Sequence, residues 1–150
     1  MDEDCSGADA HDRTAPVTSG LAASPSTFRA ASRGGSIAAA RRPIGTTVRY
    51  RLSEPARVRL TVERETVGRK VGKHCGAPTR SNRAKRRCTR YVAVRGSFTQ
   101  TGRQGTNSFK FTGRLSGRKL APGVYRLTGV PTDAAGNRGL AQFVRFTIVP

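Results

Sequence analysis

Residues 47–63 have the sequence TVRYRLSEPARVRLTVE, and this stretch decides the fold. In its first part Val48, Tyr50 and Leu52 alternate with arginines, and after the turn signal Ser-Glu-Pro the same alternation returns. A period of two places successive side chains on opposite faces of a β-strand, so one face is apolar and the other is charged. We therefore predict two strands joined by a turn, each with one face buried in a core.

The same alternation recurs along the rest of the chain. The further strands that it predicts lie around residues 17–21, 27–29, 91–94, 108–115, 124–130 and 143–149. No segment has a 3.6-residue period over three turns, and no run of about 18 apolar residues occurs, so we predict no transmembrane helix. Short strands separated by turn residues indicate an all-β fold, a β-sandwich of about seven strands. We expect a disordered acidic tail at 1–15 and a single sandwich domain at 16–150.

The charge of the chain is large and uneven. The 150 residues include 28 Lys and Arg against nine Asp and Glu, which gives a formal net charge of +19. Residues 1–12 hold five of the acids and no Lys or Arg, so the rest of the chain carries +24. A chain this basic binds polyanions at least loosely. Most of its cations are arginines, an excess that a high-GC genome also produces, and we expect Arg49, Arg51, Arg57 and Arg59 to make one sheet face positive.

The charge is densest in residues 69–90, the basic segment, which holds nine cations and no acid. The candidates for polyanion binding are Arg69, Lys70, Lys73, Arg80, Arg83, Lys85, Arg86, Arg87 and Arg90. We expect this segment and residues 30–45 to be loops that offer variable surfaces. The scattered arginines elsewhere are explained by solubility and genome composition, so the basic segment is the stronger candidate for a binding site.

Two cysteines bracket most of the basic segment. Cys75 and Cys88 have twelve residues between them, and a disulfide closing a loop of that size stabilises by about 3 kcal/mol. The alternatives are two free thiols or a metal site with His74, but His11 is the only other histidine and structural zinc needs four ligands. We expect the disulfide, and therefore a compartment outside the cytoplasm. Cys5 is then an odd thiol.

Candidate catalytic groups are few. A hydrolytic triad needs a base, and only His11 and His74 are available. The acids outside residues 1–12 are Glu54, Glu63, Glu65 and Asp133. We expect Glu63 and Glu65 to share the solvent face of one strand rather than to act as a catalytic pair. The cations expected to pair with such acids are Arg59, Arg64 and Arg69.

Residues 133–137, DAAGN, allow two interpretations. An Asp and an Asn near a turn could help to bind calcium, but that ion takes six to eight oxygen ligands and acids are scarce here. The structural interpretation is an Asx turn, with Gly136 or Asn137 at positive φ between antiparallel strands. No phosphate-binding glycine pattern occurs either. We therefore predict no enzymatic activity, no cofactor and no metal site.

Several passages, in their order along the chain, resemble the Ig-like domain of the flagellar hook-capping protein and its extracellular relatives. They are PVTSGL and SPSTF within 16–28, YRLSEPARV at 50–58, GTNSFKFTG at 105–113 and LAPGVYRL at 120–127. The later TDAAGN at 132–137 is common to bacterial surface Ig-like and fibronectin-type modules. The resemblance covers roughly residues 14–149. It implies an immunoglobulin/fibronectin-III-like antiparallel β-sandwich of secreted high-GC bacterial proteins, with a basic insertion at 69–90 in place of a short hairpin.

These observations predict a non-catalytic Ig-like module that acts as a structural spacer or an adhesion domain. We expect it in the extracellular space or the cell envelope, although no signal peptide is visible in residues 1–12. Its expected partners are anionic cell-wall polymers, lipid headgroups or another surface protein, contacted through salt-sensitive electrostatics. We also expect the chain to be part of a larger multidomain protein.

The alternative from another class is a nucleic-acid-binding protein that contacts phosphates with the basic segment. The segment has no aromatic residue for base stacking, since only Tyr91 lies at its margin. A third interpretation is a redox or metal module built on Cys75 and Cys88. The state of these two sulfurs and the shape of the basic segment separate the three interpretations.

Overall fold

The computed structural model describes residues 13–38 and 44–150. The predicted tail at 1–15 lies almost entirely outside them, as do Cys5, His11 and part of the expected loop at 30–45. The described residues form thirteen strands, more than the seven predicted, because several strands have only two or three residues. In these parts of the chain there is no helix that could cross a membrane.

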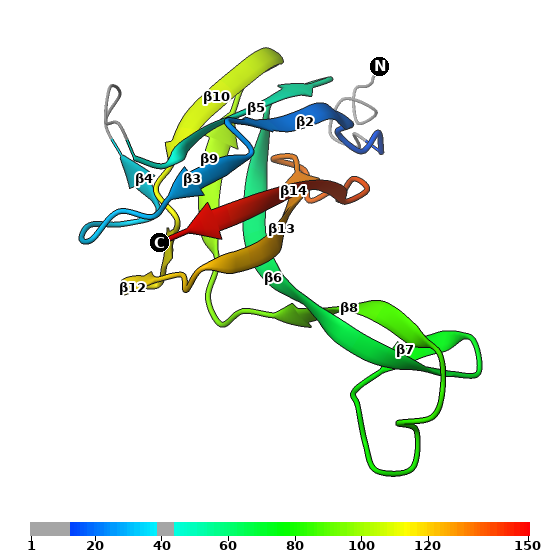
Figure 1. Cartoon of the computed structure of the whole chain (residues 1–150). Helices are drawn as coiled ribbons and strands as arrows, with labels where there is room; N and C mark the ends of the chain where they lie inside the picture. Colours follow the sequence, from blue (N-terminus) through cyan, green and yellow to red (C-terminus); the bar gives the residue numbers. More distant parts are fainter. Residues whose placement is uncertain (1–12, 39–43) are drawn as a thin grey trace, which may run out of the picture.

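The strands form two large sheets that enclose the core between them (Figure 1). One sheet contains, in order, β2 (Thr18–Ser24), β5 (Thr46–Leu52), β10 (Gly105–Phe111) and β4 (Ile37–Ala38). The other contains, in order, β3 (Thr27–Arg29), β14 (Gln142–Val149), β13 (Gly123–Thr132), β6 (Ala56–Val71) and β7 (His74–Gly76), with β8 (Arg87–Ala93) and β9 (Phe98–Gly102) also paired to β6. A small ribbon joins β11 (Arg114–Leu115) and β12 (Arg118–Lys119).

The two strands predicted from residues 47–63 are present, and they lie in opposite sheets. β5 contributes Val48, Tyr50 and Leu52 to the core, and the first half of β6 faces them with its own alternate residues buried. The turn between them therefore carries the chain from one sheet to the other. This placement corrects the expectation of one positive face, because the arginines of β5 and those of β6 cover opposite outer faces of the sandwich.

Aromatic rings fill the centre of the core. Phe111 is fully buried, and its ring centroid lies 5.6 Å from those of both Phe98 and Phe146. Phe146 also stacks on Tyr125 at 5.5 Å. Aromatic pairs in such arrangements stabilise beyond the area that they bury. The strands predicted around 108–115 and 143–149 are thus largely present as β10 and β14, with Phe111 and Phe146 on their buried faces.

The chain also passes from one sheet to the other near its start, between β2 and β3. β2 pairs antiparallel with β5, whereas β3 lies in the other sheet and pairs parallel with β14. The sandwich is therefore antiparallel except at this edge. At the other end of the molecule, the Asp133 side chain accepts hydrogen bonds from the backbone N–H groups of Ala135 and Asn137 at 3.0 and 2.8 Å, and Gly136 has a φ of +89°. This arrangement confirms the predicted Asx turn.

Candidate functional site

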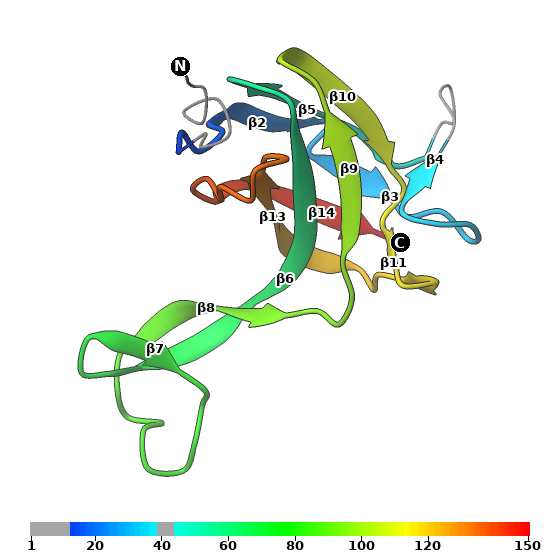
Figure 2. The same cartoon turned by 180° about the vertical axis from the view of Figure 1, so that it is seen from behind.

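β6 is 16 residues long, and only its first half lies in the sandwich. Val62 is its last residue in the core, and its pairing with β13 ends at Arg64. Beyond this point β6 pairs with β8 on one edge and β7 on the other, since Arg69 is opposite both Arg87 and Gly76. Figures 1 and 2 show that this part projects away from the two sheets. We call residues 66–92 the arm.

The basic segment is therefore not the loop that was predicted. Strand pairing continues along β6 to Val71, and the loop is confined to a turn after β6 and to residues 77–86. Ladder hydrogen bonds pair β6 with β8 up to Arg69 and with β7 from Arg69 to Val71, so backbone pairing supports the arm although it has no hydrophobic core of its own. The local sequence could not indicate this, because the alternation after Val62 no longer separates apolar from polar residues.

Cys75 and Cys88 form a disulfide, as predicted, with their Cα atoms 5.9 Å apart. They belong to β7 and β8, which flank β6, so the bond crosses over one face of the middle strand. Gly68 lies beneath the crossing: a Cβ at this position would be 2.5 Å from Cys75 Sγ and 2.7 Å from the Gly76 carbonyl oxygen. A glycine is needed here because the two strands approach so closely, a common reason for glycine inside a strand.

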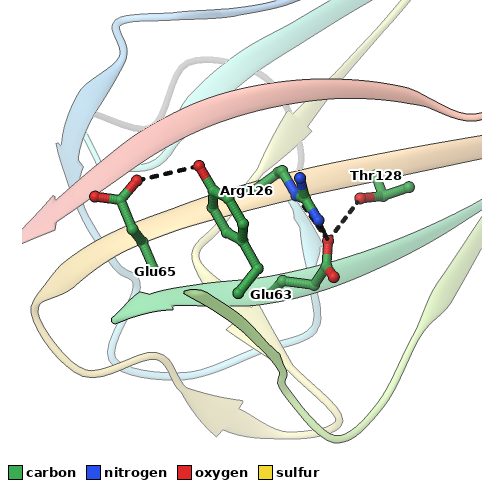
Figure 3. A network of polar contacts seen from close by, with 5 residues as sticks. Glu63, Glu65, Arg126 and Thr128 are labelled. Carbon is green, nitrogen blue, oxygen red and sulfur yellow. Dashed lines mark hydrogen bonds and ion pairs between the residues drawn. The ribbon is translucent and has the colours of Figure 1, made fainter. Parts of the chain in front are cut away.

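A polar network fixes the base of the arm on the outer face of the large sheet (Figure 3). Glu63 accepts hydrogen bonds from Arg126 Nε at 2.8 Å and from Thr128 Oγ1 at 3.2 Å. The Arg126 guanidinium also lies over the ring of Tyr91, 3.8 Å from its centroid, and over that of Phe143 at 4.6 Å. The network thus joins β6, β8, β13 and β14 where the arm leaves the sandwich.

The second acid at the base has its own partners. Glu65 accepts hydrogen bonds from Tyr91 Oη at 3.3 Å and from Arg145 Nε at 3.1 Å, and the hydrogen bond and charge of Glu65 raise the pKa of Arg145. The prediction that these acids pair with Arg59, Arg64 or Arg69 of their own strand was wrong, since Arg126 and Arg145 pair with them instead. Arg64 lies on the opposite face of β6, because side chains alternate along a strand, and Arg69 donates to the Lys85 carbonyl oxygen at 2.9 Å.

The loop at the tip of the arm is ordered by one buried side chain, Asn82. Its Oδ1 accepts from the backbone N–H of Thr79 at 2.8 Å, and its Nδ2 donates to the Ala77 carbonyl oxygen at 2.9 Å. Its own carbonyl oxygen accepts from the N–H of Lys85 at 2.9 Å. The cations of this loop therefore stand on a defined backbone.

All nine predicted polyanion-binding residues lie on the arm. Arg69 and Lys70 belong to β6, Lys73 to the following turn, Arg80, Arg83, Lys85 and Arg86 to the tip loop, and Arg87 and Arg90 to β8. Seven are exposed and two are half-buried. The arm contains no acid, and none of its nine cations forms an ion pair within the described part of the chain. Among the described residues, no acid neutralises this positive charge.

A scan against protein-family models and a search of curated proteins found no match for this chain. The arm is therefore described by its shape, its charge and its contacts. It projects from the body, its side chains carry one sign of charge, and it is held at its base by two acids, at its middle by a disulfide and at its tip by Asn82. Gly68 and the partners of the two acids were missed from the sequence, since each depends on residues brought together by folding. Asn82 was also missed, although its partners Ala77, Thr79 and Lys85 are all near it in sequence.

Proposed function

We propose that the chain is a non-catalytic Ig-like module of the extracellular space or cell envelope whose arm docks on anionic surface polymers. The observation that carries this proposal is the arm, with nine cations and no acid on a projecting, disulfide-crossed ribbon. A flexible polyanion can contact such a ribbon from several sides at once. Binding releases the counterions of the polymer, which makes the affinity large and salt-dependent.

Two features of the sandwich support the Ig-like assignment. The phenol of Tyr125, at the start of β13, donates to the Ala121 carbonyl oxygen at 2.6 Å. A tyrosine that bonds back to the backbone a few residues upstream is the tyrosine corner of Ig-like sandwiches. The first strands also divide between the sheets, since β2 pairs with β5 and β3 with β14. Tyr125 and Ala121 lie within the resembling passage at 120–127, and most of β2 and β3 lies within the passages of 16–28.

Two further observations favour an extracytoplasmic polymer over nucleic acid. The disulfide is typical of proteins in oxidising compartments. Proteins that bind single-stranded nucleic acid stack bases on exposed aromatic rings, but Tyr91 is the arm's only aromatic residue and the Arg126 guanidinium covers its ring at 3.8 Å. Phosphate groups along a polymer remain available to the arginines, whose planar guanidinium groups bind phosphate in a bidentate manner.

The test is a salt-dependent titration with a poly(glycerol phosphate) of defined length. We expect the logarithm of the affinity to fall linearly with the logarithm of the salt concentration. The variant carrying Arg80→Ser, Arg83→Ser and Arg86→Ser removes exposed charges from the tip loop. It should lower the affinity at least about tenfold and reduce the steepness of the salt dependence by about two to three in the log–log plot.

The matched control carries Arg49→Ser, Arg57→Ser and Arg59→Ser, which removes the same charge from exposed positions of the sandwich. Because charges beyond about 10 Å are screened at moderate salt, this variant should bind the polymer nearly as well as the wild type. Equal losses in the two variants would overturn the proposal, since binding would then reflect net charge alone. Tighter binding to single-stranded DNA than to the polymer would favour the nucleic-acid alternative instead.

A further inference from the structure

A second basic cluster lies where the arm leaves the sandwich, on the face of β6 opposite to Glu63. Arg64, Arg95, Arg118 and Lys119 line a hollow of about 250 Å³ there. They come from β6, from the residues after β8 and from β12, so the cluster is formed only by the fold. None of the four pairs with an acid among the described residues.

The floor of this hollow is apolar. Val94, Leu115, Leu120 and Tyr125 line it, and the last three are buried side chains of the core. A second hollow of about 550 Å³ adjoins it and shares Arg95 and Arg118. The site therefore combines an edge of positive charge with an apolar base, the combination of a few polar groups and apolar walls that is typical of small-molecule sites.

Arg64 is exposed, and contacts with its neighbours restrict its guanidinium. Its guanidinium carbon lies 5.8 Å from the centroid of the Tyr125 ring, and its Nη2 donates to the Pro122 carbonyl oxygen at 3.5 Å. It also packs on Gly123, where a Cβ would lie 3.3 Å from Nη2. A cation fixed by its neighbours loses little conformational entropy when it binds an anion.

The two loops that carry the other cations are locked together. Gly96 has a φ of +112°, and the side chain of Ser116 occupies the space that a Cβ on Gly96 would need. Ser116 has a φ of 51°, the only positive value of a non-glycine residue in the described ranges. Ser116 and Gly117 are the two turn residues between β11 and β12, and a two-residue hairpin turn of this kind has positive φ at both positions. The contact places the segment that carries Arg95 against the turn that precedes Arg118.

We propose that this hollow, the basal pocket, binds a single organic phosphate. The phosphate oxygens accept hydrogen bonds from Arg95 and Arg118, with Arg64 and Lys119 adding charge, and the carbon part of the ligand lies on Leu115 and Leu120. A phosphate group carries up to two negative charges and so matches four converging cations better than a carboxylate does. The apolar floor explains why the ligand carries an organic group. The pocket shares no residue with the nine arm cations, so substitutions can test this proposal and polymer docking by the arm separately.

The test compares phenyl phosphate with inorganic phosphate by NMR chemical-shift titration at physiological salt. We expect saturable shifts for phenyl phosphate at residues 94–96 and 115–121, with an affinity at least about tenfold higher than that of inorganic phosphate, because only the former contacts the floor. The double variant Arg95→Ala and Arg118→Ala changes two exposed side chains. It should fold as the wild type does and lose about tenfold in affinity for phenyl phosphate.

Two controls separate this proposal from the first. The double variant Arg57→Ala and Arg59→Ala removes the same charge elsewhere, and the triple arm variant removes the tip cations; both should bind phenyl phosphate as the wild type does. Equal affinity for the two phosphates, or no specific loss in Arg95→Ala and Arg118→Ala, would overturn the proposal. Vesicles containing phosphatidylglycerol and short poly(glycerol phosphate) then distinguish a lipid from a polymer source, by which of the two loses binding in the same double variant.

Discussion

The sandwich body, meaning the described residues outside the arm, and the arm share the strand β6 but are stabilised in different ways. All 17 residues of the hydrophobic core belong to the body. The arm contributes none, and its largest apolar side chains, Val67, Val71 and Val92, are 45%, 52% and 38% exposed. The body is thus held by burial, and the arm by ladder hydrogen bonds, one disulfide and the contacts at its two ends.

The difference shows how a chain keeps a strongly charged surface in a defined shape. Unpaired charges cannot be buried without a large desolvation cost, so a segment with nine cations and no acid cannot form a core. A covalent crossing replaces the missing core, as in small disulfide-rich domains. The body supplies the hydrophobic core, and most cations of the arm are exposed, so they can contact a partner.

The largest expected effect belongs to the body. Phe111→Ala removes a fully buried ring that packs on Phe98 and Phe146, and it should lower the free energy of unfolding by about 3–5 kcal/mol. The matched change in the arm, Val67→Ala, should cost less than about 1 kcal/mol, because Val67 is 45% exposed. Urea denaturation measures both. Similar costs for the two changes would contradict the contrast between the regions.

The next largest effect on stability is expected in the arm, when its disulfide is removed. Replacing Cys75 and Cys88 together by serine removes a constraint worth about 3 kcal/mol in the chain-entropy description. We expect the loss to appear as faster amide hydrogen exchange in β7 and β8, while β13 and β14 keep their protection, because the arm can open without disrupting the core. Uniformly faster exchange in all four strands would mean that the arm and the body unfold as one unit.

A smaller effect tests the crossing itself. Gly68→Ala places a methyl group 2.5 Å from Cys75 Sγ, and such overpacking costs about 1–3 kcal/mol. The cost should shrink when Cys75 and Cys88 are both serine, since β7 is then free to move away. A double-mutant cycle measured by hydrogen exchange of the arm gives this coupling. Strict additivity of the changes would show that the disulfide is not what requires the glycine.

The smallest expected effect is a loss of stability at high pH, which arises in the body and is absent at neutral pH. Tyr50 is buried, its phenol donates to Gln100 Oε1 at 2.7 Å, and burial raises the pKa of Tyr50 to about 12. Above about pH 10 the unfolded chain releases the phenolic proton while the folded protein retains it, so stability falls as the pH rises. We expect a loss of about 1 kcal/mol by pH 11. Tyr50→Phe should flatten this dependence, whereas an unchanged slope would assign it to other groups.

Much of the body could be predicted from the sequence. The strand at 27–29 and the strand beginning near residue 47 were placed within one residue, because alternation directly reports which side of a strand is buried. The Asx turn at Asp133 was predicted for a similar reason, since its hydrogen bonds stay within five residues. The sequence is sufficient to predict a contact of this kind when the partners of a residue are its near neighbours along the chain.

The arm and the basal pocket could be predicted only in part. The cysteine pair and the density of charge are visible in the sequence, but the length of β6 depends on pairing with β8, some twenty residues further along. The charged partners of Glu63 and Glu65, Arg126 and Arg145, lie on β13 and β14, about 60 to 80 residues away. The cations of the basal pocket are also far apart along the chain, so only the folded structure shows that they lie together.

The continuity of β6 has a mechanical consequence. One uninterrupted strand runs from beneath the cystine to the aromatic core, and other strands pair with it along its whole length. A pull applied at the tip along the strand axis would load these ladders in shear. Because ladder hydrogen bonds lie perpendicular to the strands, many would have to break together before β6 could slide. The arm is therefore joined to the body as a tether that transmits tension directly into the aromatic core of the sandwich.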